Sequence, residues 1–160
     1  MRWWGNLLAA AAAVSVACGG GGGSSQPKPS QSAESAVRQF FQAVADSDIA
    51  RMSSLWGTEK GSAASTGQPT DWQKRLVVTQ IYLRGSPYKI LGDDPIEGNA
   101  THRKVTVELD RGECKRTVPI TAVRSDRDGW LVNSIDLNLA GTPARPCAPI
   151  GDEQAPKQKK

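Results

Sequence analysis

The chain has 160 residues, of which 22% are charged, and 20 Lys and Arg against 16 Asp and Glu give it a net charge of +4. Five of these basic residues and two of the acidic ones lie within positions 1–31 and 151–160, so the segment 32–150 is nearly neutral. A nucleic-acid-binding domain gathers basic residues on one face, and we therefore expect no nucleic-acid partner. The segment 32–150 is long enough to form one domain with one core, and we predict that it holds no metal or cofactor.

The first 17 residues have the composition of an export signal. A positive end at Arg2 precedes an apolar run from Leu7 to Val16, and small residues close the segment, in the order typical of a secretory signal peptide. The apolar run is shorter than the roughly 20 residues that a membrane-spanning helix needs. We therefore predict that residues 1–17 direct the chain out of the cytoplasm and are then removed.

Cys18 follows this segment directly. The sequence SVAC at positions 15–18 resembles the lipobox of bacterial lipoproteins, although that family usually has a large aliphatic residue where Ser15 stands. The resemblance implies that Cys18 carries a lipid with acyl chains such as palmitate, and that the protein lies in the bacterial cell envelope. Two alternatives stay open: an ordinary signal peptidase would leave Cys18 a free thiol, and an uncleaved segment would act as the anchor.

The segments at the two ends are low in complexity. Residues 18–31 continue from the lipidated cysteine as a linker rich in Gly, Ser and Pro, which is typical of a flexible spacer. Gly19 behind the cysteine resembles lipoproteins that are sorted to the outer membrane, which implies a location facing the periplasm. Residues 151–160 are basic, and we expect a disordered tail, with contact to anionic lipid as the alternative.

From Ser32 the pattern is that of a helix that ends before a turn at 46–48. Its apolar stripe, at the spacing i, i+3, i+4 and i+7, consists of Val37, Phe40, Phe41 and Val44. Asp48 offers an N-cap for a second, shorter helix over 49–56. The polar segment 57–69 follows, and we interpret it as a loop too polar to bury, either an insertion or a mobile flap over a pocket.

A third helix is expected after this loop. Thr70 is the predicted N-cap, with Gln73 completing a capping box. One side of the helix carries Trp72, Leu76, Gln80 and Leu83, flanked by Val77 and Ile81. Glycine and proline at positions 85 and 87 end it.

Beyond residue 87 the apolar period changes from 3.6 to 2, which indicates strands over 88–91, 105–109, 115–124 and 130–139. The expected inward residues are Val105, Val107, Leu109, Val118, Ile120, Ala122, Ile135, Leu137 and Leu139. Pro119 indicates an edge position or a bulge, because proline cannot donate a ladder hydrogen bond. Helices first and strands after predict an α+β fold, in which N-terminal helices cover one face of a curved antiparallel sheet.

Three cysteines are present. If Cys18 carries lipid, Cys114 and Cys147 remain as an even pair in an oxidising compartment, where a structural disulfide is expected. The alternative, a redox-active pair, would favour close spacing such as Cys-x-x-Cys.

The segments 36–56 and 105–137 together resemble the nuclear transport factor two-like superfamily, which includes ketosteroid isomerases and polyketide cyclases of the SnoaL kind. The resemblance rests on the helix pattern FFxAVxxxD and the strand pattern GWLVxxIDL. It implies helices packed in a cone on a curved antiparallel sheet, often around an apolar cavity. Four residues were considered for an isomerase-like acid and base, and none matches the family motif: Tyr82, Tyr88, Asp94 and Asp136. His102 is the only histidine, and we interpret it as a surface residue at a strand end.

Three functions stay open at this point. The first, which we favour, is a non-enzymatic protein, anchored in the membrane by its N-terminal lipid, that binds a small apolar ligand or an envelope protein. The second is an enzyme of the isomerase or cyclase type, and the third is a structural component of the envelope. A polar pair inside the fold would favour the enzyme and an apolar cavity the small ligand, whereas a filled interior with an exposed apolar patch would favour a protein partner.

Overall fold

The computed structural model describes residues 29–150, and it has N-terminal helices followed by a four-stranded antiparallel sheet. The mixed helix and strand fold expected from the sequence is therefore confirmed. In chain order the elements are α1 (Ala33–Ala45), α2 (Ile49–Leu55), β1 (Gly57–Thr58), β2 (Gly61–Ser62), α3 (Ala63–Thr66), α4 (Trp72–Leu83), β3 (Tyr88–Ile96), β4 (Asn99–Asp110), β5 (Lys115–Ser125) and β6 (Gly129–Ile135). The segment 1–17, Cys18 with most of its linker, and the tail 151–160 lie outside the described residues, so the predictions made for them stay predictions.

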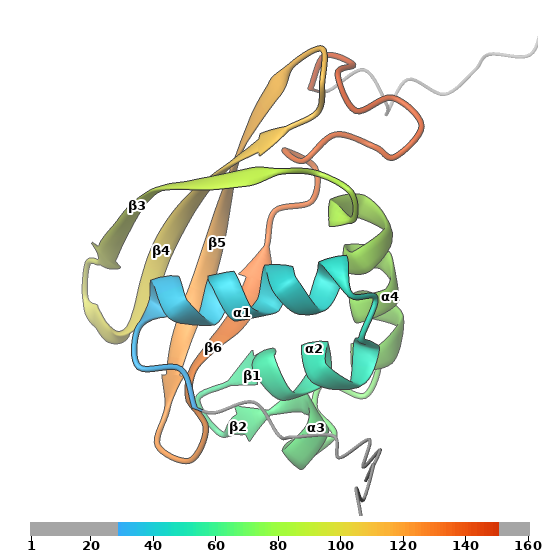
Figure 1. Cartoon of the computed structure of the whole chain (residues 1–160). Helices are drawn as coiled ribbons and strands as arrows, with labels where there is room; N and C mark the ends of the chain where they lie inside the picture. The colour runs from blue at the N-terminus through green and yellow to red at the C-terminus, as the bar shows by residue number, and fades with distance from the viewer. Residues whose placement is uncertain (1–28, 151–160) are drawn as a thin grey trace, which may run out of the picture.

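The larger sheet is a meander in which β3, β4, β5 and β6 each pair with their neighbours in the sequence. It curves around α1, which lies across one face and contacts all four strands (Figure 1). α2 and α4 pack beside α1. β1 and β2 form a separate hairpin that lies next to β6. The fold thus has a layer of helices on one face of the sheet and a small hairpin at the β6 edge.

The predicted apolar stripe makes α1 the centre of the core. Ser32 caps the helix, since its Oγ accepts a hydrogen bond from the Ser35 amide at 3.1 Å. Val37, Phe40 and Val44 are at most 1% exposed. They meet the inward residues of β4 and β5, which are those expected from the alternating pattern: Val105, Val107, Leu109, Val118, Ile120 and Ala122. Each large side chain buried in this way stabilises the fold by about 1.5–3 kcal/mol.

Pro119 does not lie at the edge of the sheet, because β5 is a central strand. Its carbonyl accepts a hydrogen bond from the Asp136 amide at 3.4 Å, just beyond the end of β6. The N–H and C=O of one residue point to the same side of an antiparallel strand. The missing N–H of Pro119 therefore faces the end of β6, where no ladder bond is lost. The bulge lies further along, at the register shift between Thr121 and Ala122.

β3 is longer than predicted. The sequence indicates a strand that ends at Leu91, but β3 continues through the expected turn 92–95 as far as Ile96. A register shift just before Gly92 makes a bulge and leaves Leu91 49% exposed, after which the ladder with β4 resumes. Gly92 therefore lies at a bulge, and Pro95 lies on an edge strand. A bulge and a proline both hinder the pairing of this edge with another chain.

β6 is shorter than the predicted strand 130–139. It ends at Ile135, because the Leu137 amide donates to the Ile135 carbonyl at 3.0 Å and turns the chain away from the sheet. Ile135, Leu137 and Leu139 still pack against the core as expected, although they are only partly buried. Leu137 and Leu139 do so from the segment that follows the strand.

The sequence predicts that the segment 57–69 is a loop too polar to bury, and this prediction is wrong for its first half. Residues 57–62 form the β1–β2 hairpin, and α3 follows. Gly57 is buried, and a side-chain Cβ there would lie 2.3 Å from the Gly61 carbonyl oxygen, so only glycine fits. The Ser62 amide donates to the Asp128 carboxylate at 2.7 Å, and Asn133 Nδ2 donates to the Gly57 carbonyl at 2.8 Å. Polar groups from β6 and its preceding turn therefore bury this hairpin.

The start of α4 also differs from the prediction. Asp71, not Thr70, is the N-cap residue, and its carboxylate makes no capping bond to the backbone. Instead it accepts hydrogen bonds from Arg75 Nε at 2.9 and 3.0 Å. The capping box predicted with Gln73 is therefore absent, because the helix begins one residue later.

Candidate functional site

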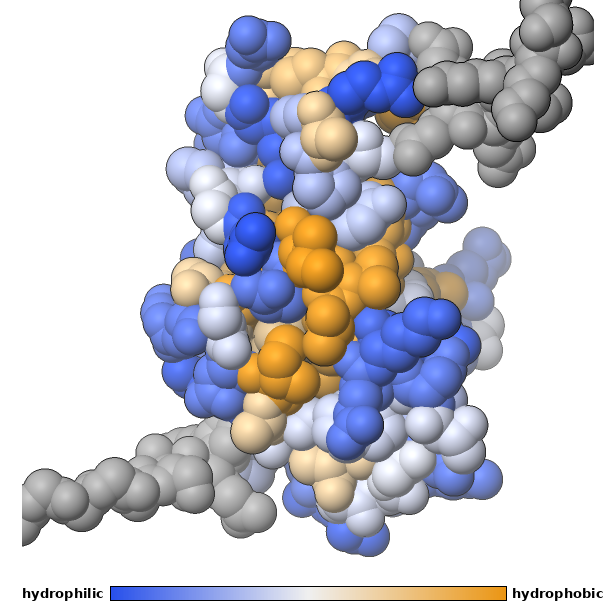
Figure 2. Space-filling model, turned by 90° about the vertical axis from the view of Figure 1, so that its right-hand side faces the viewer, coloured by the Kyte–Doolittle hydropathy of each residue, from blue (hydrophilic) through white to orange (hydrophobic). Residues whose placement is uncertain are grey.

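Helix α4 carries three of the five large hydrophobic side chains that are exposed within residues 29–150. Val77, Val78 and Ile81 are 45%, 38% and 42% exposed. Figure 2 views the molecule from the side where α4 lies and shows an apolar patch surrounded by polar residues. Single exposed apolar residues are ordinary, whereas a contiguous patch with a polar rim marks an interaction surface. We call Val77, Val78 and Ile81 the α4 face.

These residues point outward because α4 uses its other side for the core. That side is buried against α1 and α2 through Leu76, Thr79, Gln80 and Leu83. Gln80 Nε2 donates to Ser47 Oγ at 2.9 Å, so its buried amide has a partner and fixes the rotation of the helix. With 3.6 residues in each turn, positions 77, 78 and 81 are then left on the solvent side.

Two hollows extend the α4 face. One, of about 340 Å³, lies between α4 and the end of β6, and Val78 and Leu137 contribute to its lining. The other, of about 450 Å³, is lined in part by Leu137, Tyr82 and Ile150. Since Leu137 lines both hollows, the apolar surface continues from α4 onto the segment 136–150, which we call the strap. Hollows of a few hundred Å³ are large enough to take side chains of a partner.

The charged residues beside this surface are mostly basic. Lys74 and Arg75 line the first hollow, and Arg116 and Arg145 line the second. Asp71 also lines the first, where the hydrogen bond from Arg75 lowers the pKa of the Asp71 carboxyl. Asp71 therefore stays ionised and offsets the charge of Arg75. Lys74, Arg116 and Arg145 leave an excess of positive charge around the apolar surface.

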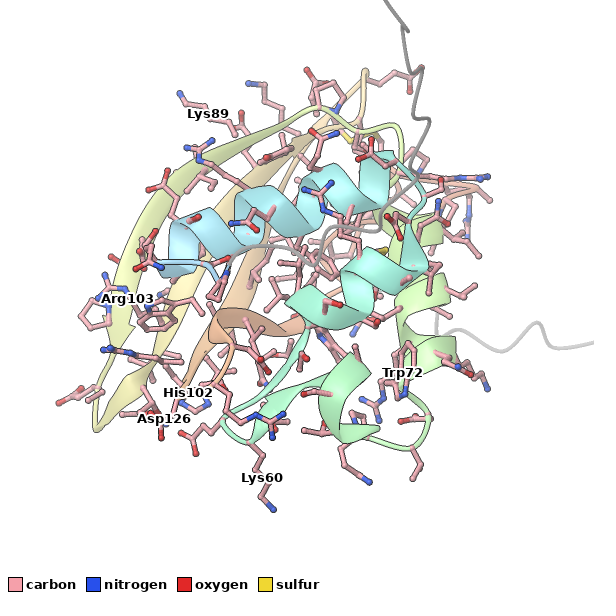
Figure 3. All side chains as sticks on the ribbon, turned by 60° about the horizontal axis from the view of Figure 1, so that its bottom comes forward. Lys60, Trp72, Lys89, His102, Arg103 and Asp126 are labelled. Carbon is pink, nitrogen blue, oxygen red and sulfur yellow. A yellow bond between two sulfur atoms is a disulfide. The ribbon has the colours of Figure 1, made fainter. Side chains whose placement is uncertain are left out.

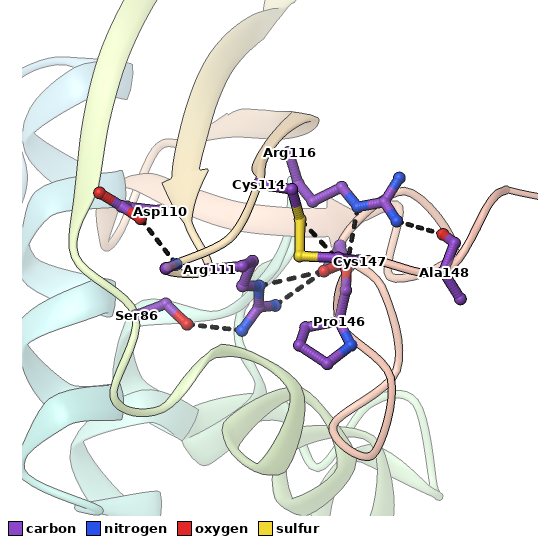
Figure 4. Close-up of a disulfide and its surroundings, with 10 residues drawn as sticks. Ser86, Asp110, Arg111, Cys114, Arg116, Pro146, Cys147 and Ala148 are labelled. Carbon is purple, nitrogen blue, oxygen red and sulfur yellow. Dashed lines mark hydrogen bonds between the residues drawn. A yellow bond between two sulfur atoms is a disulfide. The ribbon is translucent and has the colours of Figure 1, made fainter.

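The strap is attached to the turn between β4 and β5. The structure places the sulfur atoms of Cys114 and Cys147 2.03 Å apart, which agrees with the predicted disulfide. Arg116 donates hydrogen bonds to the carbonyls of Pro146 and Ala148 on the strap (Figure 4). One covalent link and one guanidinium therefore fix the end of the strap against β5.

Arg111 connects the strap to α4. Its guanidinium donates to the carbonyls of Tyr82 at 2.7 Å and Ala140 at 2.9 Å, and to the hydroxyl of Ser86. Burial lowers the pKa of Arg111, and the charge of Arg116 adds to this effect. A guanidinium nevertheless stays protonated at neutral pH. Arg111 thus holds together the two parts of the apolar surface, α4 and the start of the strap.

The space between α1 and the sheet is filled by side chains. Phe40, Met52 and Leu76 are at most 1% exposed and belong to one cluster with the inward residues of the sheet. Phe41 stacks on Tyr88 with the ring centroids 4.3 Å apart. Both hollows described above lie outside this cluster, so it is the surface of the protein that offers room for a binding partner.

The four residues considered for catalysis come from separate places. Tyr82 lies on α4 and is partly buried, and Tyr88 lies on β3 in its stack with Phe41. Asp94 on β3 and Asp136 after β6 are both exposed. An exposed carboxylate lacks the apolar surroundings that shift an acid for catalysis. The structure therefore forms no buried acid and tyrosine pair from this set.

His102 is more enclosed than a surface residue at a strand end. Its side chain is 22% exposed, and Nδ1 lies 3.6 Å from Glu59 Oε1, in the turn between β1 and β2. Thr101 Oγ1 lies 3.1 Å from the same nitrogen and hydrogen-bonds to Glu59. No local pattern in the sequence indicates this cluster, because Glu59 approaches His102 only once the unexpected hairpin has formed.

Comparison with protein-family models, with curated proteins and with solved structures finds no match to this chain. Within residues 29–150, no helix combines the length and the apolar character needed to cross a membrane. In the same part of the chain, no three His, Cys, Asp or Glu side chains gather where a metal ion would bind.

Proposed function

We propose that this protein is a lipoprotein of the bacterial cell envelope, anchored through a lipid on Cys18, and that it binds another protein through the α4 face and the strap. The proposal assigns it no catalytic activity. The observation that carries it is the exposed apolar patch of Val77, Val78 and Ile81, which the two hollows continue toward Ile150.

The filled interior supports a protein partner over a small apolar ligand. A ligand held inside the fold needs a cavity that buries most of its surface, whereas side chains such as Phe40 and Met52 occupy the space between α1 and the sheet. An elongated apolar surface with two shallow hollows suits a polypeptide, which contacts several points at once.

The basic rim supports a partner of a particular chemistry. Lys74, Arg116 and Arg145 surround the apolar surface, and complementary charge across an interface selects the partner and speeds association. The partner we propose has apolar side chains for the α4 face and the hollows, with carboxylates at the edge. A second copy of this chain would place the same basic rim on both sides of a two-fold interface, where like charges repel.

The position of the tether is compatible with this role. Ser30, near the start of the described residues, pairs with Gly129 and Trp130 at the turn between β5 and β6. The described part of the chain therefore begins near this turn, whereas α4 lies on a different side (Figure 1). An anchor at Cys18 would leave the α4 face open to the periplasm.

The superfamily to which the fold belongs is also part of what we propose. We propose that the helices form the cone of the nuclear transport factor two-like superfamily, on the strength of the helices-first order and of α1 lying across the curved meander. Membership of that superfamily would not assign a function, because one fold hosts many activities. The partner-binding role rests on the α4 face and the strap and does not depend on that membership.

Site-specific crosslinking tests the proposed function. A benzoylphenylalanine at position 81, in the full-length chain expressed in its own cells, is expected to give one defined crosslinked protein. The same group at position 89, on β3, is the control and is expected to give none. The partner is then identified by mass spectrometry, purified and titrated with the protein.

The titration decides the outcome. Val78→Asp is expected to raise the Kd by at least about tenfold, which corresponds to about 1.4 kcal/mol, whereas Lys89→Gln leaves it unchanged. Higher salt is expected to weaken binding further, because the rim charges are exposed. Equal crosslinking from positions 81 and 89, or a Kd that Val78→Asp does not change, would contradict the proposal.

A further inference from the structure

A third hollow lies beside the β1–β2 hairpin and adjoins the first hollow at the start of α4. Its volume is about 630 Å³, which is within the range of small-molecule sites. Trp56, Glu59, Lys60, Pro69, Arg75 and His102 contribute to its lining. We call it the hairpin groove. The groove shares Trp56, Arg75, Asn133 and Ser134 with the first hollow, whereas the residues of the hairpin and of β4 line the groove alone.

His102 and Ser134 in the lining of the hairpin groove lie on the side of the sheet that faces away from α1. Along β4, Val105, Val107 and Leu109 point into the core, and successive residues of a strand point to opposite faces. His102 is therefore on the other face. Ser134, which also lines the groove, pairs with Thr121 on that same face. The hairpin and the segment around Pro69 close over this face and make the groove.

The polar contacts of His102 orient its ring. Nδ1 is engaged by Thr101 Oγ1 at 3.1 Å and faces the Glu59 carboxylate at 3.6 Å. These neighbours favour a proton on Nδ1, since a carboxylate only accepts hydrogen bonds. Nε2 is then the nitrogen left for a ligand. Glu59 is in turn tied to Thr101 and His102, so its charge is partly satisfied within the protein.

Two cations of the groove retain free donors. Arg75 uses Nε for Asp71, and no hydrogen bond within residues 29–150 engages its two terminal nitrogens. Lys60 forms no ion pair in the same part of the chain. Against them the lining has one carboxylate, that of Glu59. Because Asp71 offsets the charge of Arg75, the groove offers an anion these free donors of Arg75 and Lys60 and not a net positive charge.

The walls between these charges are apolar and flat. Trp56 is partly buried and is held by a bridge to Val132 of β6. Pro69 is partly buried in the lining as well. The bridge to Val132 joins the two backbones and places Trp56 beside the groove. Its indole ring offers a face for stacking, and stacked aromatic pairs are worth about 0.5–1.5 kcal/mol beyond the area that they bury.

We propose that the hairpin groove binds a small aromatic carboxylate. Its ring lies against Trp56 and Pro69, and its carboxylate accepts hydrogen bonds from the terminal nitrogens of Arg75 and from Lys60 Nζ. Figure 3 shows Lys60 and His102 at the end of the molecule that carries the hairpin, with Lys89 far from them. The site shares Trp56 and Arg75 with the first hollow, but Val78 is not among its lining residues and Lys60 does not line the partner surface. Either proposal can therefore fail without the other.

Calorimetry and NMR on the purified chain test this site with 2-naphthoate as the probe and 2-naphthamide as its uncharged counterpart. Naphthoate is expected to bind saturably and to shift the backbone amide signals of Gly57, Thr58 and His102. The double variant Lys60→Gln/Arg75→Gln is expected to raise its Kd by about tenfold or more, because hydrogen bonds to charged groups are worth about 1.5–3 kcal/mol. Lys89→Gln is the matched control and is expected to leave the Kd unchanged.

Three results would overturn the proposal. Naphthamide binding as tightly as naphthoate would show that the anion is not recognised. An unchanged Kd for naphthoate in the folded double variant would show that Lys60 and Arg75 do not bind the ligand. Amide shifts confined to α4 positions 77–81 would show that naphthoate binds the α4 face and not the groove. The amide spectrum of each variant also reports whether it has kept its fold.

Discussion

Helices α1 and α4 are nearly equal in length, with 13 and 12 residues, but they use their apolar residues in opposite ways. All the large apolar residues of α1 are buried against the sheet and its neighbours, and only the small Ala45 at its end is exposed. α4 buries Leu76 and Leu83 and leaves Val77, Val78 and Ile81 at the surface. The apolar residues of α1 are thus explained by the stability of the fold, whereas three of those on α4 are not. This difference is the basis for assigning α4 a partner.

The largest expected effect is on α1. Phe40→Ala removes a fully buried side chain from the centre of the core and is expected to lower the free energy of unfolding by about 3–5 kcal/mol. Ile81→Ala on α4 is the matched change and is expected to shift it by no more than about 0.5 kcal/mol. Urea unfolding followed by circular dichroism measures both. Similar losses of unfolding free energy in the two variants would contradict the proposed difference between α1 and α4.

The disulfide is expected to have the next largest effect. Replacing Cys114 and Cys147 by Ser removes a link between residues 33 positions apart, and such losses cost about 2–4 kcal/mol. Because the disulfide holds the strap against β5, we also expect faster hydrogen exchange in segment 137–148, which forms part of the partner surface. An unchanged exchange rate there would show that Arg111 and Arg116 hold the strap without the sulfur link.

Arg111 comes third. Arg111→Met removes the hydrogen bonds to Tyr82, Ala140 and Ser86 and is expected to cost about 2 kcal/mol, within the range for hydrogen bonds that involve a charged group. Arg127→Met, at an exposed position in the turn before β6, is the control and is expected to have little effect. Thermal unfolding compares the two variants. Equal midpoints would mean that α4 and the strap do not depend on this guanidinium.

The smallest expected effect comes from the exposed ion pair at the start of α4. Arg75 lowers the pKa of Asp71, so the pair stabilises the fold above the pKa of an unfolded aspartate, and this contribution is lost as the pH falls through the lowered pKa. Asp71→Asn is therefore expected to be slightly less stable than the wild type at neutral pH and equally stable in strong acid. A deficit that persists in acid would assign Asp71 a role other than its charge.

The elements that the sequence predicts well are those whose contacts repeat along the chain. The stripe of α1 and the alternation in β4 and β5 repeat over several residues, and the structure buries them as expected. The cap at Asp48 is also local, and its carboxylate accepts from the Arg51 amide at 2.8 Å. Each of these features depends on neighbours within a few positions.

The elements that the sequence does not predict depend on distant partners. The β1–β2 hairpin is buried by Asp128 and Asn133, which lie 66 or more positions further along the chain. β3 continues past Gly92 only because β4 accepts the bulge. For the candidate site, the flanking positions of Val77 and Ile81 follow from the helix pattern, but their exposure depends on which elements pack against α4. The hairpin groove requires Glu59 and His102 to meet across two separate elements.

Chemical protection of α4 in the cell envelope tests the central claim most directly. In full-length chains that contain Ile81→Cys or Lys89→Cys, the rate of maleimide labelling is measured in intact cells and with the purified protein. We predict that labelling at position 81 is slower in cells by about tenfold or more, as expected for a site that is occupied more than 90% of the time by a bound partner, and that labelling at position 89 proceeds at the same rate in both. Equal rates at position 81 in cells and in solution would contradict the account.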